Sequence, residues 1–141
     1  MADVTQLIEQ DHREVEGLFE QFKNGGSESV AAKICEELEV HAAAEEKVFY
    51  PVVKSDVPGG DDMASEGNEE HGEARQLIGR IKQTSDEAHL ADLVTDLEEA
   101  VSHHVQEEES EMLPKTRDAL DAARLDELGA SFESEKANLQ S

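Results

Sequence analysis

Four histidines are followed by a glutamate one helical turn later, and two of these pairs stand out because both of their members face an apolar stripe. His41 is followed by Glu45, and His104 is followed by Glu108. Side chains four residues apart lie on the same face of an α-helix, so each pair can direct an imidazole nitrogen and a carboxylate oxygen at one point. Iron, manganese and zinc all accept these donors. With the single histidine that precedes each pair, the candidate metal ligands are His12, His41, Glu45, His71, His104 and Glu108.

Direction separates these candidates from the many other polar residues of the chain. An α-helix turns by about 100° per residue, which places His41 and Glu45 within about 20° of the centre of their apolar stripe. Glu108 lies almost at the centre of its own stripe, whereas His103 points more than about 100° away. Buried carboxylates need partners, so inward-facing polar groups on four helices predict a shared metal site. We interpret His103 and His89 as solvent-exposed.

The histidine–glutamate pairs belong to a repeated unit. In both units a proline, Pro51 or Pro114, follows the histidine by ten residues, and each proline should kink or end its helix. A helix with one inward histidine precedes each unit. The repeat therefore predicts two similar helical hairpins, residues 1–57 and 61–119, that face each other.

Apolar residues recur at helical spacing in four long stretches, which predicts an all-α fold. The stretches are Val4 to Phe22, Val30 to Val52, Ala64 to Ile81 and Leu90 to Met112. Glycine, asparagine, aspartate and serine at their boundaries are typical of helix caps. Short connections between long amphipathic helices predict an up-down-up-down four-helix bundle.

A weaker apolar stripe near the C-terminus consists of Leu125, Leu128 and Phe132. It predicts a short additional C-terminal helix that packs on the outside of the bundle and has a frayed end. The expected division is a bundle at residues 1–119 and a C-terminal helical segment at residues 120–141.

The composition excludes several classes of partner. The chain has 35 acidic and 12 basic residues, a formal net charge of −23, which repels nucleic acids and anionic membranes. No basic leader followed by an apolar stretch is visible, and no apolar run approaches the roughly 20 residues that span a bilayer. The single cysteine, Cys35, cannot form an internal disulfide, which suits a reducing compartment. We expect a cytoplasmic protein whose partners are small molecules; the oligomeric state is left open.

Six histidine and glutamate ligands suit two metal ions better than one. The set contains no cysteine, which argues against structural zinc. If both glutamates bridge two divalent ions, an oxo or hydroxo bridge from solvent is favoured because it balances the remaining positive charge. Each ion then keeps one open position for oxygen, peroxide or nitric oxide. Asp11 and Glu70, next to two of the histidines, are candidates to orient the imidazole rings.

The chain resembles the hemerythrin-like, HHE cation-binding domain family in an ordered set of segments: Asp11-His12-Arg13-Glu14, His41-x-x-x-Glu45-Glu46-x-x-Phe49-Tyr50-Pro51, Glu70-His71 and His104-x-x-x-Glu108-Glu109. The resemblance covers residues 1 to about 119. It implies a four-helix bundle around a non-haem di-iron centre, with the six candidates as ligands and the two glutamates bridging.

The chain departs from oxygen-carrying hemerythrins at two positions. Those proteins place a second histidine one turn after the third-helix histidine, where this chain has Arg75. They take the last carboxylate from an aspartate at the position of Glu109, whereas the better-directed group here is Glu108. Glu70, Asn68 or water are the candidates to replace the missing nitrogen.

These observations favour a di-iron protein that reacts with oxygen, peroxide or nitric oxide in detoxification or stress response. Enzymatic consumption of peroxide or nitric oxide is one form that such a function can take. The alternatives are an iron- or oxygen-sensing binding module, and oxygen carriage or storage, which Arg75 disfavours. The resident metal, the physiological substrate and the electron donor are left open.

Overall fold

The computed structural model describes residues 2–140, and every regular element in that range is helical. The elements, in chain order, are α1 (Val4–Lys23), α2 (Glu28–Ala44), the π-helical turn η1 (Glu45–Phe49), α3 (Tyr50–Asp56), α4 (Gly60–Gln83), α5 (Glu87–Glu107), the π-helical turn η2 (Glu108–Met112), α6 (Leu113–Ala119) and α7 (Ala122–Gln140).

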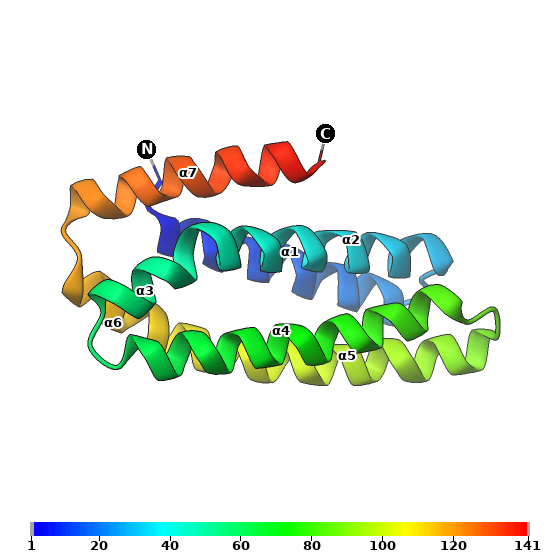
Figure 1. Cartoon of the computed structure of the whole chain (residues 1–141). Helices are drawn as coiled ribbons and strands as arrows, with labels where there is room; N and C mark the ends of the chain where they lie inside the picture. The colour runs from blue at the N-terminus through cyan, green and yellow to red at the C-terminus, as the bar shows by residue number, and fades with distance from the viewer. Residues whose placement is uncertain (1, 141) are drawn as a thin grey trace.

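Four long rods form the predicted up-down-up-down bundle (Figure 1). The second rod is α2, η1 and α3 in succession, and the fourth is α5, η2 and α6. Helix α1 packs against α2, and α4 packs against α5, as expected for two helical hairpins joined by short loops. The all-α bundle with an additional C-terminal helix is therefore confirmed.

Local sequence explains where the helices begin. Asp3 caps α1 through a capping box with Gln6, in which each side chain accepts from the other residue's backbone N–H. Before α4, Gly59 adopts a left-handed conformation (φ 74°) that is unfavourable for residues with a Cβ. Helix α4 begins at Gly60, slightly earlier than the sequence pattern predicts. Asp61 and Asp62 thus lie in its first turn, where negative charge stabilises the helix dipole.

Both internal prolines follow a π-helical turn. The N–H groups of Tyr50 and Leu113, which precede Pro51 and Pro114, donate to the carbonyls five residues earlier. A proline lacks an N–H, and its ring clashes with the carbonyl four residues back, so a wider turn gives the ring room. The predicted interruption takes the form of a π turn in each rod, and the chain stays helical on both sides.

The core consists of two apolar clusters with a polar layer between them. One cluster contains Phe49, Leu113 and Phe132 and lies where α3, α6 and α7 meet the bundle. The other contains Phe19 and Leu97 and fills the opposite half of the four rods. Buried histidine and glutamate side chains separate the two clusters; such glutamates are almost never fully buried unless they are paired.

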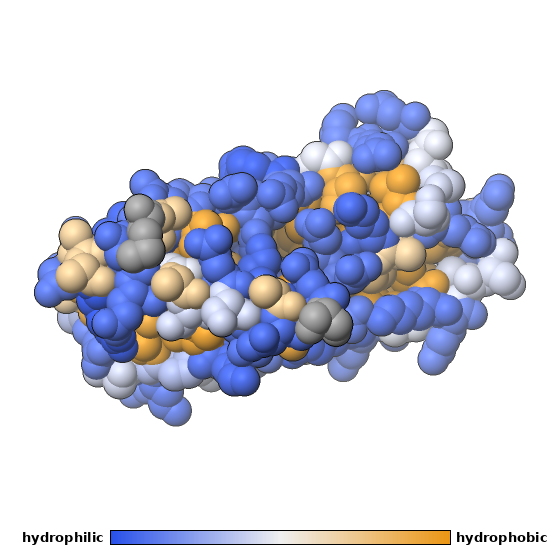
Figure 2. All heavy atoms as spheres, turned by 90° about the horizontal axis from the view of Figure 1, so that it is seen from above, coloured by the Kyte–Doolittle hydropathy of each residue, from blue (hydrophilic) through white to orange (hydrophobic). Residues whose placement is uncertain are grey.

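Helix α7 packs on α1, α2 and η1 (Figure 1). Its predicted apolar stripe, Leu125, Leu128 and Phe132, is buried. The helix has 19 residues and continues to Gln140, while Ser141 lies outside the described residues. The predicted fraying of the end of this segment stays a prediction. The face on this side of the molecule is mainly hydrophilic, with apolar side chains visible between the polar ones (Figure 2). Along residues 2–140, no helix combines the length and the apolar character needed to cross a bilayer.

Candidate metal centre

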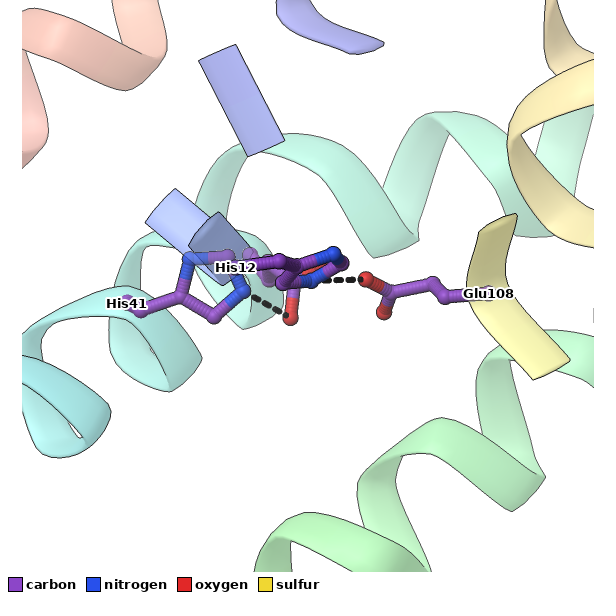
Figure 3. Close-up of side chains that lie close together, drawn as sticks. His12, His41 and Glu108 are labelled. Atoms are coloured by element: carbon purple, nitrogen blue, oxygen red, sulfur yellow. Dashed lines mark ion pairs between the residues drawn. The ribbon is translucent and has the colours of Figure 1, made fainter. Parts of the chain in front are cut away.

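The six side chains singled out from the sequence meet in the polar layer between the two apolar clusters. Each is at most 9% exposed, although they come from α1, α2, η1, α4, α5 and η2. Figure 3 shows His12 and His41 approaching from one side and Glu108 from the other. The structure therefore brings together all the residues that the sequence placed on inward faces.

The first group of possible ligands consists of His12, His41, Glu45 and Glu108, whose donor atoms all lie within 4.8 Å of one another. His12 Nε2 is 3.1 Å from Glu108 Oε1, an ion pair drawn in Figure 3. His41 Nε2 is 3.2 Å from Glu45 Oε1. Both imidazoles thus direct the same ring nitrogen into the interior.

The second group shares both glutamates with the first and adds His71 and His104. His71 Nε2 is 3.1 Å from Glu45 Oε1, and His104 Nε2 is 3.1 Å from Glu108 Oε2. Glu45 and Glu108 therefore lie between two pairs of histidines. Two adjacent cation sites that share two carboxylates fit this arrangement.

A cation would satisfy polar atoms that the protein itself leaves without hydrogen bonds. Among the described residues, four buried side-chain atoms have no hydrogen-bond partner: His12 Nε2, His41 Nε2, Glu45 Oε2 and Glu108 Oε1. All four belong to the first group. Buried polar atoms are rarely left unpaired in folded proteins, so this concentration at one point fits a metal ion with nitrogen and oxygen ligands.

A ring of outer carboxylates holds the opposite nitrogen of each imidazole. His41 Nδ1 is 2.8 Å from Asp11, His71 Nδ1 is 2.7 Å from Glu46, His104 Nδ1 is 2.6 Å from Glu70, and His12 Nδ1 is 2.7 Å from Glu109. A carboxylate that accepts from Nδ1–H fixes the tautomer in which the Nε2 lone pair faces the interior. Each bond joins two different rods, so the ring also ties the four rods together.

Two of these orienting carboxylates, Asp11 and Glu70, were candidates from the sequence. Each bonds the histidine of the neighbouring helix rather than the histidine beside it in the chain. Glu109, which follows Glu108 in η2, belongs to the same ring, because it bonds His12 Nδ1 and Arg13. Arg75 points outward and forms a bidentate ion pair with Glu46.

Tyr50 is the residue of the centre that sequence reasoning missed. It is 2% exposed, and its hydroxyl donates to Glu108 Oε2 at 2.6 Å. The Tyr50 hydroxyl oxygen also lies 3.4 Å from the Nε2 atoms of His71 and His104, at the middle of the second group.

Gly67 makes room for this phenol. It lies one helical turn before His71 on α4, and a Cβ added there would be 2.6 Å from the Tyr50 hydroxyl oxygen. The phenol ring also stacks on His71, with ring centroids 5.3 Å apart. Asn68 lines a surface hollow on α4, and Glu70 is bonded to His104 from outside. The space beside the second group is therefore occupied by the Tyr50 phenol and not by Asn68 or Glu70.

The buried carboxylates change the acid–base properties of their neighbours. Burial opposes protonation of His41, but the Glu45 charge and the hydrogen bond to Asp11 outweigh it and raise the His41 pKa to about 10. Burial, together with the charges of Glu45 and Glu108, raises the pKa of Tyr50 well above its ordinary value. The centre thus attracts positive charge strongly, as two carboxylates in an apolar interior must.

Two cavities adjoin the centre. A cavity of about 40 Å³ lies beside all four histidines and is closed on its other side by apolar residues such as Val15, Leu38 and Val101. A smaller pocket, about 20 Å³, opens beside His104 and Glu108 and is lined by four further glutamates. One approach to the centre is therefore apolar and the other is acidic.

The predicted surface histidines behave differently from the inward ones. The His103 side chain is 64% exposed, and His89 is exposed as well. His103 does not reach the interior, but it lies beside Glu70 and Glu107, and these three residues form a separate group of possible ligands at the surface.

Known proteins resemble this chain in sequence and in fold. The pattern of the family described as the Hemerythrin HHE cation binding domain matches residues 3–116. A protein named DNA nickase from Nostoc sp. (strain PCC 7120) is 29% identical over 143 residues. That match includes 98% of this chain, which spans 40% of the length of the Nostoc protein.

A solved structure has the same fold. The crystal structure of a Hemerythrin HHE cation binding domain-containing protein from Mycobacterium kansasii superposes with a TM-score of 0.83. The superposition covers 99% of this chain and 88% of that one, at 20% sequence identity. At this identity the likeness shows a shared fold, including the additional C-terminal helix.

Proposed function

Because this chain belongs to the hemerythrin HHE cation-binding domain family, we propose that its buried histidines and glutamates hold two iron ions that react with oxygen, peroxide or nitric oxide. In this proposal His12 and His41 hold one ion, His71 and His104 hold the other, and Glu45 and Glu108 bridge them. Iron bound in this way supplies redox chemistry toward these small molecules.

The observation that carries the proposal is the set of four unpaired buried atoms around one point. Two are imidazole Nε2 atoms and two are carboxylate oxygens, which is a donor set that suits iron. Structural zinc sites are usually closed by cysteine thiolates, and none is present here, because Cys35 lies in the apolar cluster away from the centre. Manganese uses the same donors, so metal analysis must accompany every functional test.

Tyr50 makes the two ion positions unequal. Its phenol oxygen lies beside His71, His104 and Glu108, so it can serve as an oxygen ligand for the second ion after losing its proton. The corresponding position of the second hairpin, five residues after Glu108, is Leu113, which is fully buried. The first ion therefore lacks an equivalent ligand and keeps one more open coordination position.

The apolar cavity beside the four histidines supports small, weakly polar substrates. Its volume of about 40 Å³ exceeds the 10–15 Å³ or so that one water molecule needs, but it is far smaller than a typical pocket for an organic ligand. Oxygen and nitric oxide fit such a space, and its apolar lining favours them over ions. Peroxide can reach the centre from the acidic pocket by hydrogen bonding.

The direct test is metal analysis of the purified protein together with its visible spectrum before and after peroxide. We expect two iron ions per chain and a spectrum that changes on reaction. A protein that binds no stoichiometric metal under iron-replete conditions, while retaining its helical fold, would contradict the proposal.

Kinetic and binding measurements distinguish an enzyme from a sensor or a carrier. Consumption of peroxide or nitric oxide over many turnovers supports a detoxifying enzyme. Tight iron binding that orders the helices without turnover supports an iron- or oxygen-sensing module. A stable and reversible oxygen adduct supports carriage or storage.

We further propose that the chain does not bind nucleic acid, even though one relative is named DNA nickase. The 35 acidic residues against 12 basic ones give it a field that repels phosphates. Incubating the iron-loaded protein with supercoiled plasmid at low salt tests this point. The proposal would be overturned if the wild-type protein converted the plasmid to the relaxed form and the His104→Ala variant did not.

A further inference from the structure

We propose that Glu70, His103 and Glu107 form a surface site for a divalent cation that feeds the buried centre through the adjacent acidic pocket. His103 Nε2 lies 2.9 Å from Glu107 Oε1 and 3.5 Å from Glu70 Oε2. One donor atom from each of the three residues falls within 4.8 Å of the others. The delivery step rests on the proposed function, whereas the surface site does not.

The donor set suits a transition-metal cation. One imidazole and two carboxylates accept Fe²⁺, Mn²⁺ or Zn²⁺, and the exposure of His103 leaves the remaining positions to water. Two carboxylates that converge on one point repel each other, and a cation removes that repulsion. Because few protein ligands hold it, an ion bound here exchanges quickly, as an acquisition site requires.

Glu70 connects the surface site to the interior. Its Oε2 atom faces His103, while its Oε1 atom accepts a hydrogen bond from His104 Nδ1 at 2.6 Å. One carboxylate therefore belongs both to the surface site and to the ring that orients the buried imidazoles. An ion at the surface site is separated from the buried centre only by the Glu70 carboxylate and the His104 ring.

The acidic pocket supplies the route by which a cation moves from the surface site to the buried centre. Glu70 and Glu107 line it together with the buried His104 and Glu108, and Glu66 and Glu111 stand at its edge. Glu108 lines this pocket and is only 2% exposed, so a cation that moves inward through the pocket meets a buried carboxylate of the centre. Clefts lined by one sign of charge raise both the local concentration of counter-ions and their association rate.

Zinc titration followed by NMR of the histidine rings tests the surface site. We expect the His103 Nε2 resonance of the metal-free wild-type protein to shift on adding Zn²⁺. In Glu107→Gln the affinity reported by this resonance should fall about tenfold. His89→Ala, which removes another exposed histidine of the same helix, should leave it unchanged. A His103 resonance that does not respond, or responds equally in Glu107→Gln, overturns the proposal.

The same titration separates this proposal from the proposed function. The rings of His12 and His41 report the buried centre. If they never respond to metal while His103 does, the buried centre fails and the surface site stands. If they respond and His103 does not, the opposite holds.

Loading kinetics test delivery. Under anaerobic conditions, Fe²⁺ should enter His103→Ala and Glu107→Gln about tenfold more slowly than the wild type, and the final iron content should be the same. His89→Ala should load at the wild-type rate. Equal loading rates in all four proteins overturn the delivery step.

Discussion

At the level of single residues, the buried centre depends on which nitrogen of each imidazole carries the proton. The four outer carboxylates accept from the Nδ1 atoms at 2.6 to 2.8 Å, and this leaves every Nε2 directed inward. The chain thus fixes the orientation of four rings before any ion arrives. Such preorganisation increases metal affinity because little ordering remains to be done on binding.

His104→Ala tests the inward assignment. His104 Nε2 is 3.1 Å from Glu108, so its loss should lower the iron content to about one ion per chain or less, since one of few nitrogen ligands is removed. His103→Ala is the matched control, because the neighbouring ring points to solvent; its iron content at equilibrium should equal that of the wild type. Equal losses of iron in both variants would mean that the assignment of His104 to the interior and His103 to the surface is wrong. Inductively coupled plasma analysis measures the outcome.

Tyr50→Phe tests whether the phenol oxygen binds iron. The variant retains the ring that stacks on His71 and removes only the hydroxyl. We expect iron content close to that of the wild type and loss of the visible absorption that a phenolate–iron bond produces, with resonance Raman bands of the tyrosine lost in parallel. Identical spectra in both proteins would show that Tyr50 acts only as a hydrogen-bond donor to Glu108.

The His41 pKa gives the metal-free protein a pH-dependent stability. Its folded-state value of about 10 lies above the ordinary 6.5, so protonated His41 stabilises the fold fully below pH 6.5, and this contribution is lost as the pH rises toward 10. We expect the Tm of the chelator-treated protein to fall on the order of 5 °C across this range. The metal-loaded protein should change less, because a cation replaces the proton. A metal-free Tm that rises between pH 7 and pH 10 would contradict this cause.

At the level of elements, the two π turns decide which side chains enter the centre. A π turn contains one more residue than an α turn, so the residue five positions after Glu45 faces the same way as Glu45. That residue is Tyr50, and five positions after Glu108 it is Leu113. Side-chain directions estimated at 100° per residue assume an unbroken α-helix. After a π turn, each estimated direction is therefore wrong by one residue. For this reason the sequence predicted six polar residues of the centre and missed the seventh.

The rest of the architecture could be predicted because it follows from local rules. Helical periodicity predicts the four rods. His41 precedes the first π turn and Glu45 is its first residue, so the turn does not change their inward positions. Asp11 and Glu70 could be named as orienting residues, but their partners could not, since each bonds across to another helix. The bond between Glu109 and His12 could not be predicted either, because Glu109 lies within η2 and its partner is on another helix.

Helix α7 supports the first group of possible ligands through two side chains, Lys136 and Phe132. Lys136 Nζ lies 2.5 Å from Asp11 Oδ1, and Asp11 in turn holds His41. Phe132 of the same helix packs edge-on against the His41 ring at a centroid distance of 6.0 Å. The C-terminal helix thus forms the outer wall of the first site, although it lies beyond the residues that match the family.

Lys136→Met tests this contribution. Removing the ammonium group leaves Asp11 with one partner fewer, and we expect iron to be lost to a competing chelator about tenfold faster. The control is Lys47→Met, because Lys47 also pairs with α7, through Glu135 at 3.2 Å, but has no contact with Asp11. Both variants should lose little stability, about 1 kcal/mol or less. Equal iron release from both would assign the effect to helix docking alone.

At the level of the whole molecule, the centre separates two kinds of surroundings. Toward the loops that join α1 to α2 and α4 to α5, the histidines border an apolar cavity. Toward α3 and α6, Glu108 and His104 border the acidic pocket. The six side chains can therefore be approached from one end of the bundle through apolar surroundings and from the other through acidic ones.

Val101→Phe tests the role of the apolar cavity. Val101 lines it on α5, and the larger ring should fill the space at a cost of about 1–3 kcal/mol in stability. We expect xenon binding, measured by NMR, to be lost and the reaction with nitric oxide to slow, while the iron content stays unchanged. Val30→Phe serves as control, because Val30 packs against the same apolar cluster without lining the cavity. Unchanged nitric oxide kinetics in Val101→Phe would show that substrate enters by another path.

The close approach of Gly67 to Tyr50 also limits how this chain can change over evolutionary time. Any side chain at position 67 would collide with the phenol, so a lineage must first replace the tyrosine with something smaller before the glycine can mutate. The reverse order passes through an intermediate in which the phenol must move from its place beside Gly67. Homologous sequences should therefore show the two positions substituted together, and reconstructed intermediates with alanine at 67 and tyrosine at 50 should be the ones that fail to persist.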